Sequence, residues 1–303
     1  MKFRPELSVN QNIQLPFKTK VTLHLKREDL IHPIISGNKY RKLKYNIAFA
    51  EAHNHDTLLT FGGAFSNHIA ATAEAGRVYG FKTIGIIRGE ELHDKIQDNP
   101  TLKFAQSCGM QFKFISREQF RLKSTQSLIE KLKREYGDFY QIPEGGTNDL
   151  AIKGCQEILT PNDKQYDCIC ASVGTGGTLS GLINSSSLSQ QVLGFSALKG
   201  DFLKEDISKF ATQNNWQLLT NYHFGGYAKI NGDLVTFINQ FKTAQQIALD
   251  PVYTGKMLFG IFELIQNGFF KDNAKILAIH TGGIQGIEGM NKRLKQKQQQ
   301  LII

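Results

Sequence analysis

The sequence alternates along most of its length between short strand-like segments and longer helical ones. Segments such as 57–61, 167–173 and 275–279 are short and apolar, and most strand-like segments precede a stretch whose apolar residues recur every three or four positions. A chain that repeats strand and helix in this way pairs its strands in parallel and covers both faces of the sheet with helices. The sequence therefore predicts an α/β protein with open, twisted, mostly parallel sheets flanked by helices.

The individual elements follow from the same periods. We expect strands at 21–25, 57–61, 82–88, 111–115, 139–143, 167–173, 191–197, 217–222 and 275–279. We expect helices at 38–51, 66–79, 95–107, 118–136, 148–159, 201–213, 233–248 and 256–266, with a helix beginning at about 178 and a solvated helix end at 291–297.

Composition narrows the class of protein. The chain has 303 residues, enough for two packed domains, and its 41% hydrophobic and 21% charged residues are ordinary for a water-soluble globular protein. It contains neither an apolar stretch typical of a signal peptide at its start nor an apolar run of the roughly 18–20 residues that span a membrane. We therefore expect a cytoplasmic protein without a membrane partner.

Charge and cysteine content disfavour two further classes. The net charge of +9 is not accompanied by interleaved basic and aromatic residues, so we expect no nucleic-acid partner. The four cysteines lack C-x-x-C spacing, and Cys168 and Cys170 alternate within an apolar strand. We expect buried free thiols, with neither a disulfide framework nor a metal site.

Glycine pairs follow several of the expected strands. They are Gly62-Gly63, Gly145-Gly146, Gly176-Gly177 and Gly282-Gly283, with Gly225-Gly226 in a similar position. Any single pair is compatible with an ordinary tight turn. Because ligands bind beyond the carboxyl ends of parallel strands, the recurrence of such pairs indicates backbone packed closely against a ligand.

The glycine-rich segment with the strongest signal is 174–178, which joins a strand to a helix. Its residues are Gly174, Thr175, Gly176, Gly177 and Thr178. Successive backbone N–H groups, the start of a helix and two hydroxyls together favour a phosphate. The segment has neither the Gly-Lys-Ser/Thr ending of a nucleotide-binding P-loop nor the G-x-G-x-x-G spacing of nicotinamide enzymes. A phosphorylated cofactor or sugar is the expected ligand, and a nicotinamide-dependent oxidoreductase is disfavoured.

A second chemical signal lies in the basic stretch 36–43, where a strand-like segment gives way to a helix. Lys39 could form an imine with an aldehyde once its amine loses a proton, and the neighbouring cations Arg41 and Lys42 would disfavour the protonated form. Gly37 allows the turn, and Asn38 could cap the helix that follows. Taken alone, the stretch is better explained as the solvated basic face of a surface helix.

Five motifs in this order resemble the D-cysteine desulfhydrase and 1-aminocyclopropane-1-carboxylate (ACC) deaminase family. They are Gly37 to Leu43, Gly62 to His68, Gly174 to Thr178, Asp250 to Lys256 and His280 to Gly283. The resemblance spans nearly the whole chain. It implies an enzyme that depends on pyridoxal phosphate and has the tryptophan synthase β-like fold, which is fold type II, with two sheets.

The resemblance also implies roles for individual residues. Lys39 would bind the cofactor as an imine, Lys42 and the segment Gly174 to Thr178 would hold its phosphate, and Asn67 would contact its ring hydroxyl. Ser66 would bind the substrate carboxylate or assist proton transfer, although helix capping explains Ser66 and Asn67 equally well. The residues placed near the substrate are Ser66, Asn67, His68, Tyr227, Tyr253 and Thr281. Of these, Ser66, Tyr227 and Tyr253 join Lys39 as the expected catalytic residues.

Two threonines separate the two branches of the family. By resemblance, the position of Thr254, which we count among the cofactor-binding residues, matches a glutamate in the deaminases. The position of Thr281 matches a leucine in them. A neutral residue at position 254 leaves the cofactor a weaker electron sink, which suffices when a good leaving group sits at Cβ. The resemblance therefore favours α,β-elimination from D-cysteine or a related β-substituted amino acid, with Lys39 removing the α-proton. ACC deaminase activity and a protein that binds the cofactor without turnover stay as alternatives.

The resemblance implies a domain division and an assembly as well. Residues 1–44 and 146–303 would form a large cofactor domain, residues 45–145 a smaller α/β domain, and two copies of the chain a homodimer. Two positions depart from the family pattern: Phe65 replaces a polar residue, and Glu144 replaces an apolar one. These departures affect the expected substrate more than the expected cofactor.

Overall fold

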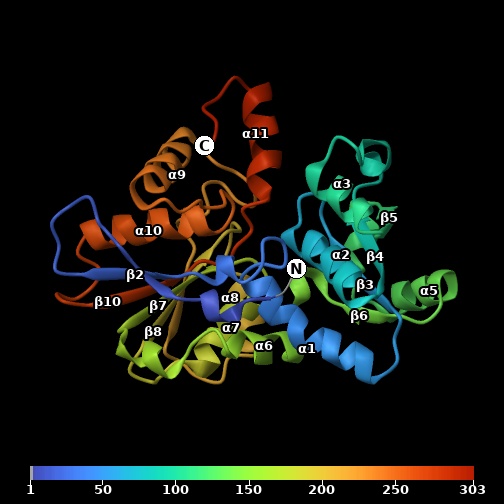
Figure 1. Cartoon of the computed structure of the whole chain (residues 1–303), viewed down its shortest axis with the longest axis horizontal. Coiled ribbons are helices and arrows are strands. Elements are labelled where there is room, and N and C mark those ends of the chain that lie inside the picture. The colour runs from blue at the N-terminus through green and yellow to red at the C-terminus, as the bar shows by residue number, and fades with distance from the viewer. Residues whose placement is uncertain (1–2) are drawn as a thin grey trace.

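The strands of the protein form two separate sheets in the computed structural model, which describes residues 3–303 (Figure 1). The larger sheet has the strand order β1-β2-β10-β7-β8-β9, and the smaller has the order β5-β4-β3-β6. All neighbouring strands run parallel except β1 and β2. The predicted fold class, two mostly parallel sheets flanked by helices, is confirmed.

The elements have the following bounds. The strands are β1 (Asn10–Ile13), β2 (Thr22–Lys26), β3 (Thr57–Gly62), β4 (Lys82–Arg88), β5 (Gln111–Ile115), β6 (Tyr140–Ile142), β7 (Cys168–Val173), β8 (Gln191–Ser196), β9 (Trp216–Leu219) and β10 (Lys275–Ile279). The helices are α1 (Asn38–Ala52), α2 (Asn67–Tyr79), α3 (Pro100–Ser107), α4 (Arg117–Arg121), α5 (Gln126–Tyr136), α6 (Asp149–Gln156), α7 (Gly177–Ser185), α8 (Leu203–Ser208), α9 (Gly232–Gln245), α10 (Thr254–Gln266) and α11 (Gly286–Gln296). Within residues 3–303, no helix has both the length and the apolar character needed to cross a lipid bilayer.

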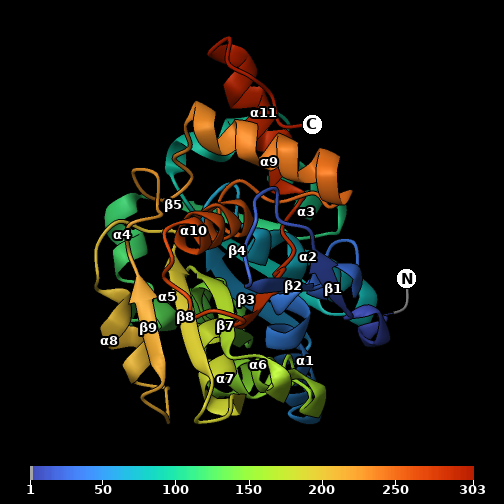
Figure 2. The same ribbon diagram turned by 90° about the vertical axis from the view of Figure 1, so that its left-hand side faces the viewer.

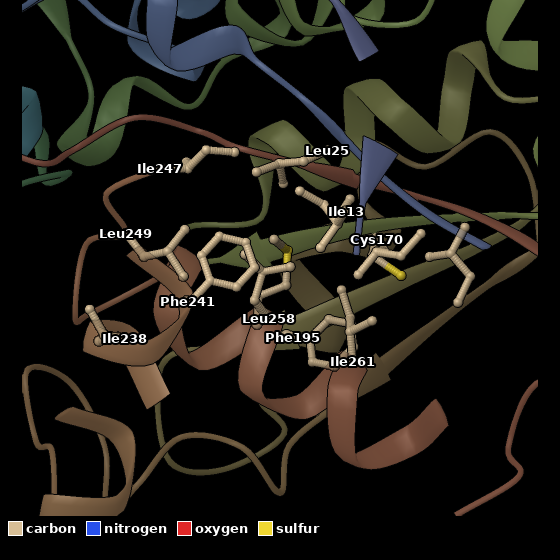
Figure 3. Close-up of a cluster of buried hydrophobic side chains, with 14 of the residues drawn as sticks. Ile13, Leu25, Cys170, Phe195, Ile238, Phe241, Ile247, Leu249, Leu258 and Ile261 are labelled. Carbon is tan, nitrogen blue, oxygen red and sulfur yellow. The ribbon is translucent and has the colours of Figure 1, made fainter. Parts of the chain in front are cut away.

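The larger sheet is buried on both faces. Successive residues of β7 point to opposite sides, so that Cys168 and Cys170 join one apolar cluster while Ile169 and Ala171 join another. The first cluster also contains side chains of α9 and α10, among them Phe241 and Leu258 in Figure 3. Figure 2 shows these two helices above the sheet, with α6 and α7 below it. Burial on both faces explains why β7 reads as a continuous apolar run.

The smaller sheet has its own buried clusters. Leu58 of β3 packs with residues of α1 and α2 on one face, and Leu59 packs with Phe120 of α4 and Leu132 of α5 on the other. Ile87 of β4 packs with α2 and α3. Each sheet thus lies between helices of its own.

Helix α1 connects the two halves of the molecule and brings the functional motifs together. In Figure 1 it runs from between the two halves to below the smaller sheet. A Cβ at Gly154 of α6 would lie 1.9 Å from the Arg41 carbonyl oxygen of α1, and one at Gly181 of α7 would lie 2.4 Å from Cys155 Cβ. Because these glycines allow α1, α6 and α7 to pack closely, the first turns of α1 and α7 lie side by side.

Three predicted helices differ from the observed ones, two of them at identifiable capping signals. The segment 118–136 forms α4 and α5 instead of one helix, because Thr125 is extended and its hydroxyl donates back to the Leu122 carbonyl at 2.7 Å. The helix expected at 95–107 begins only at Pro100, where Asn99 accepts from the Leu102 N–H at 3.0 Å. The helix expected at 201–213 ends at Ser208.

The main strand that the sequence did not reveal is β1. Its residues Asn10 to Ile13 are mostly polar and pair antiparallel with β2 at the edge of the larger sheet. Because β1 lies at the edge of the sheet and is mostly exposed or half-buried, its sequence has no regular alternation of apolar residues. The sequence therefore did not predict this strand. The predicted helix end at 291–297 is part of α11.

Candidate active site

Helix α1 begins at the site because of Gly37. This residue has φ +56°, and a Cβ there would lie 2.2 Å from the carbonyl oxygen of Thr281, so only glycine fits. Gly37 occupies the N-cap position of α1, and Asn38 is the first helical residue. The prediction that Asn38 caps the helix is therefore wrong. Its side chain instead joins Lys39 to Thr178.

Lys39 lies at the start of α1, where its amine is held by a neutral partner. Lys39 Nζ donates to Asn38 Oδ1 at 3.0 Å, and Asn38 Nδ2 donates to Thr178 Oγ1 at 2.9 Å. Burial lowers the pKa of Lys39 to about 7, and the Lys42 cation contributes in the same direction. A substantial fraction of this amine is unprotonated near neutral pH, which an imine-forming lysine requires.

Arg41, the other cation expected to lower the pKa of Lys39, pairs instead with a carboxylate. The Arg41 guanidinium is buried and donates to both carboxylate oxygens of Glu28 at 2.8 Å. Its charge is compensated there, so the shift in the pKa of Lys39 comes from burial and from Lys42 rather than from Arg41. The Arg41–Glu28 pair fixes the first turn of α1 instead.

Lys42 and the segment 174–178 form a cradle for an anion. Lys42 Nζ is buried and donates to the Gly145 carbonyl at 2.9 Å and to the hydroxyls of Thr147 at 3.1 Å and Thr175 at 3.4 Å. No carboxylate within residues 3–303 pairs with this ammonium. A buried cation with only neutral partners is stabilised by an anionic ligand.

The backbone of the same segment completes the cradle. Gly176 has φ +83° and precedes α7, so the free N–H groups of the first helical turn face the cavity. A side chain at Gly174 would crowd the Tyr253 ring, because its Cβ would lie 3.1 Å from that ring. Gly177 opens α7 but does not line the cavity, because it packs against Thr147.

The start of α2 supplies the expected substrate loop. Ser66 is the N-cap of α2, and its hydroxyl accepts from the Ile69 N–H at 3.4 Å. The capping role expected for Ser66 is therefore present. Ser66, Asn67 and His68 all line the same cavity as Lys39.

His68 is held in one tautomer by its neighbours. The Thr60 hydroxyl donates to the Ile142 carbonyl, so His68 Nε2 must donate to Thr60 Oγ1, 2.8 Å away. Nδ1 is then an acceptor, buried and without a partner within residues 3–303. Burial and the cations of Lys39 and Lys42 hold the pKa of His68 well below its usual range. His68 therefore offers the cavity a neutral acceptor rather than a cation.

Tyr227 and Tyr253 lie together in the lining of the same cavity. Their ring centroids are 6.3 Å apart in an edge-on arrangement. Burial raises the pKa of the Tyr253 hydroxyl, and the neighbouring Tyr227 and Asp250 add to the effect. Tyr227 is 41% exposed, and partial loss of water around its hydroxyl raises its pKa as well. Both side chains are thus kept as neutral hydrogen-bonding groups in the cavity.

The two threonines that separate the family branches differ in position. Thr281 lines the cavity with its hydroxyl 3.4 Å from that of Ser172. Thr254 is fully buried and does not line the cavity, since its hydroxyl donates to Asp250 Oδ1 at 2.8 Å. Asp250 also accepts from the N–H groups of Val252, Tyr253 and Thr254, which fixes the loop that carries Tyr253.

Two adjoining cavities contain these groups. The inner cavity, about 450 Å³, is lined by Lys39, Lys42, Ser66, Asn67, His68, Gly174, Thr175, Gly176, Thr178, Tyr227, Tyr253 and Thr281, among others. We call the neighbouring cavity of about 620 Å³ the outer chamber. Its lining includes Phe65, Arg88, Arg117, Arg121, Lys123, Glu144, Tyr227, Tyr253, Gly289 and Arg293.

Phe65, one of the two departures from the family pattern, points into the outer chamber. A Cβ at Gly289 of α11 would lie 2.8 Å from its ring, so the ring rests on that helix. Phe65 does not line the inner cavity. The polar group expected in relatives at this position is thus replaced by a contact between the α2 loop and α11.

Several residues of the site were not singled out from the sequence. Thr147 bonds to Lys42, Ser172 faces Thr281, and Gln285 of the inner cavity has a buried Oε1 without a partner among residues 3–303. Asn38 was expected only as a helix cap, and its bond to Lys39 was not foreseen. Arg88 lines both cavities. Only Arg88 carried a usable signal, because it ends a parallel strand, where ligand-binding residues collect.

The inner cavity suits pyridoxal phosphate on the evidence of its side chains. A lysine with a lowered pKa can react with an aldehyde, and the uncompensated Lys42 with the glycine-rich segment can hold a phosphate. The site therefore has the features of an enzyme that binds a phosphorylated aldehyde cofactor through lysine.

Comparison with known proteins agrees with this class. The model of the pyridoxal-phosphate dependent enzyme family matches residues 11–282. A Pyrococcus horikoshii protein with the provisional name ACC deaminase is 33% identical over 288 residues, which cover 87% of this chain and 85% of that protein. The mitochondrial bifunctional D-cysteine desulfhydrase/ACC deaminase of Arabidopsis thaliana is 31% identical over 294 residues, covering 88% and 73% of the two chains.

A solved structure adds to this agreement. The crystal structure of an ACC deaminase homologue superposes with a TM-score of 0.80 at 29% sequence identity, covering 97% of this chain and 96% of the other. The protein is thus a pyridoxal-phosphate dependent enzyme of fold type II. Within that class, the chain belongs to the family of ACC deaminases and D-cysteine desulfhydrases.

Proposed function

We propose that this enzyme catalyses α,β-elimination from D-cysteine or a related β-substituted amino acid, giving pyruvate, ammonia and sulfide. The observation that carries the proposal is the neutral character of the cavity around Thr281. Its polar neighbours there are Ser36 and Ser172, and the carboxylate of Asp250 is engaged by its own loop. Position 254, which by resemblance matches a glutamate in the deaminases, is occupied by a buried threonine that faces Asp250.

The residues divide the work as follows. Lys39 would hold the aldehyde carbon, and Lys42, Thr175 and the start of α7 would hold the phosphate. The cofactor, when bound, supplies an electron sink for the substrate Cα. The α2 loop with Ser66 and Asn67 would bind the substrate carboxylate through its hydroxyl and N–H groups.

Proton transfer falls to Lys39 and the tyrosine pair. Lys39 Nζ, once released by the substrate amine, is poised to remove the α-proton because burial keeps much of it unprotonated near pH 7. The raised pKa values keep Tyr227 and Tyr253 protonated, so that their hydroxyls can donate a hydrogen bond to the sulfur that leaves Cβ. Both roles use groups that line one cavity.

The second candidate function is ACC deamination, with ring opening to 2-oxobutanoate and ammonia. The name of the Pyrococcus relative favours it, and the name of the Arabidopsis relative includes both activities. ACC has no α-hydrogen, so its ring must open by a route that demands a more strongly activated cofactor. The neutral groups around Thr281 support the elimination reaction over this one.

The domain division also belongs to the proposal. We propose that residues 1–44 and 146–303 form the cofactor domain and that residues 45–145 form a smaller domain. The separate buried clusters of the two sheets support this division, and the inner cavity takes residues from both parts. Movement of the smaller part would let substrate enter and exclude water afterwards. A homodimer and a cytoplasmic location stay predictions.

The experiment that tests the function compares the wild type with Lys39→Ala. We expect the visible absorbance band of lysine-bound cofactor only in the wild type, with pyruvate and sulfide formed from D-cysteine and little 2-oxobutanoate formed from ACC. Lys44→Ala is the matched control, because Lys44 lies on the same helix and pairs with Glu157 at 2.6 Å outside the cavity. A band that ACC perturbs with release of 2-oxobutanoate, while D-cysteine is not turned over, would favour the second function.

A further inference from the structure

The outer chamber opens directly onto the inner cavity. Residues that line both are Gly63, Asn67, Arg88, Lys123, Glu144, Tyr227 and Tyr253. They include the expected substrate loop and both tyrosines. A substrate held by Asn67 therefore has the outer chamber beside it, and the chamber's volume of about 620 Å³ is much larger than a thiol group needs.

The outer chamber has unpaired positive charge. Two of its cations are neutralised, since Arg117 pairs with Glu91 at 3.1 Å and Lys123 pairs with Glu144 at 3.2 Å. Its remaining carboxylate, Asp250, is taken up by the N–H groups of its own loop. Three guanidinium groups in the chamber then lack a carboxylate within ion-pair distance among residues 3–303: Arg88, Arg121 and Arg293.

Arg88 is the one of these three that reaches the inner cavity. It is the last residue of β4, beside the end of β3 that leads into the α2 loop. Its Nη2 would lie 3.6 Å from a Cβ at Gly63, and its Cζ lies 5.6 Å from the Phe120 ring centroid. The ring of Phe120 thus supports the guanidinium. No hydrogen bond of the Arg88 side chain is present within residues 3–303, so its donors are open toward the ligand.

A planar guanidinium with open donors matches the oxygens of a carboxylate, phosphate or sulfonate group. We propose that the outer chamber is a subsite for an acidic group on the β-substituent of the substrate, and that Arg88 recognises it. The inference rests on the proposed elimination reaction and narrows its substrate class to amino acids such as O-phosphoserine or S-sulfocysteine.

The chemistry is the same as for cysteine. A proton leaves Cα, its bonding electrons form the Cα–Cβ double bond, and the Cβ–O or Cβ–S bond breaks with its electron pair going to the acidic leaving group. One water then hydrolyses the resulting enamine to pyruvate and ammonia. Arg88 would stabilise the charge that grows on the departing group, so its effect is expected on binding and on turnover.

The test compares two O-substituted serines, one with an acidic and one with a neutral substituent, as substrates of the holoenzyme. O-phosphoserine and O-acetylserine, each as both enantiomers, are assayed with the wild type, Arg88→Gln, Arg88→Lys and the control Arg134→Gln. Arg134 is exposed on α5, lines neither cavity and carries the same charge change. Turnover is measured as pyruvate. Binding is measured separately, from the concentration that half-saturates the change in visible absorbance.

We expect the wild type to prefer O-phosphoserine in binding, and Arg88→Gln to weaken that binding by about tenfold or more while changing O-acetylserine less than threefold. Arg88→Lys should keep part of the preference, and Arg134→Gln should keep all of it. Thermal melts of all variants check that each is folded.

Two outcomes would overturn the inference. One is a wild type that binds both amino acids equally or an acidic preference that survives Arg88→Gln. The other is an equal loss for both substrates in Arg88→Gln, which would mean that Arg88 binds the α-carboxylate common to both. Absence of pyruvate from every amino acid would instead refute the elimination reaction, while the binding preference would still report on Arg88.

Discussion

The inner cavity and the outer chamber are built in different ways. The cofactor end of the inner cavity consists of the half-buried Lys39, the buried Lys42, backbone N–H groups and hydroxyls, joined by hydrogen bonds. The outer chamber is lined by long charged side chains at element ends, such as Arg88 and Arg293, which are exposed or half-buried. The first arrangement fixes the shape of a ligand that stays bound. The second can change its residues without disturbing the fold, and this is where we expect substrate preference to be set.

Loss of the Lys42 ammonium should have the largest effect on the inner cavity. Lys42→Met removes the buried cation while roughly keeping the side-chain volume, and we expect affinity for pyridoxal phosphate to fall about 100-fold, since a charge-assisted contact to phosphate is lost. The measurement is titration of the apoprotein with cofactor. The matched control is Lys44→Met on the same helix. An affinity within threefold of the wild type would show that the segment 174–178 holds the phosphate without Lys42.

The same contrast explains how much the sequence could reveal. The cofactor end is encoded in short contiguous motifs, because Lys39 and Lys42 lie one helical turn apart and 174–178 is a single turn between strand and helix. Local sequence is enough to predict such a site. Asn38 was assigned the wrong task, because the capping position depends on the φ of Gly37, which the fit against Thr281 imposes.

The outer chamber depends on contacts that no local pattern encodes. Arg88 approaches Gly63 because β4 pairs with β3 in parallel. Phe65 meets Gly289 because α11 returns beside α3 after more than two hundred residues (Figure 1). Thr254 was expected at the cofactor, but the hydrogen bonds of its own turn direct its hydroxyl to Asp250. Positions of this kind need the tertiary structure.

The titration of Lys39 offers a second way to test the inner cavity. Burial gives Lys39 a pKa of about 7, against 10.5 for an ordinary lysine. The neutral fraction, which reacts with the aldehyde, then rises about tenfold between pH 6 and pH 8, and the rate of cofactor attachment to the apoprotein should rise with it. By linkage, this shift also makes the apoprotein more stable as the pH rises from about 7 toward 10.5, because the unfolded chain binds the additional proton.

Stopped-flow absorbance of the apoprotein mixed with pyridoxal phosphate measures that rate. N-acetyl-lysine over the same pH range is the control, because it reports changes in the cofactor itself. A midpoint above pH 9, as in the free amino acid, would contradict the lowered pKa and with it the base role proposed for Lys39.

Lys256 supports the turn before Tyr227, a residue that lines both cavities. We expect a smaller effect on activity from its loss. Its buried Nζ donates to the carbonyls of His223 at 2.8 Å and Gly226 at 2.9 Å, which holds the turn before Tyr227. Lys256→Met should lower kcat about fivefold through the position of Tyr227, with cofactor affinity unchanged. In the background of Tyr227→Phe, the same substitution should cost little more. An additive loss would mean that Lys256 acts on stability or on another residue.

Phe65 tests whether the departure from the family pattern matters for the substrate. Its ring lies in the outer chamber against Gly289 and is 43% exposed, so it contacts α11 rather than the groups around Lys39. Phe65→Gln, which restores a polar residue, should therefore change the KM for D-cysteine less than twofold. It should lower the free energy of unfolding by about 1 kcal/mol through the lost apolar contact. Leu188→Gln, at an exposed position that lines neither cavity, is the control and should change neither value. A tenfold change in KM would mean that the α2 loop takes its shape from the contact with α11. Phe65 would then affect substrate binding in the inner cavity although it lines only the outer chamber.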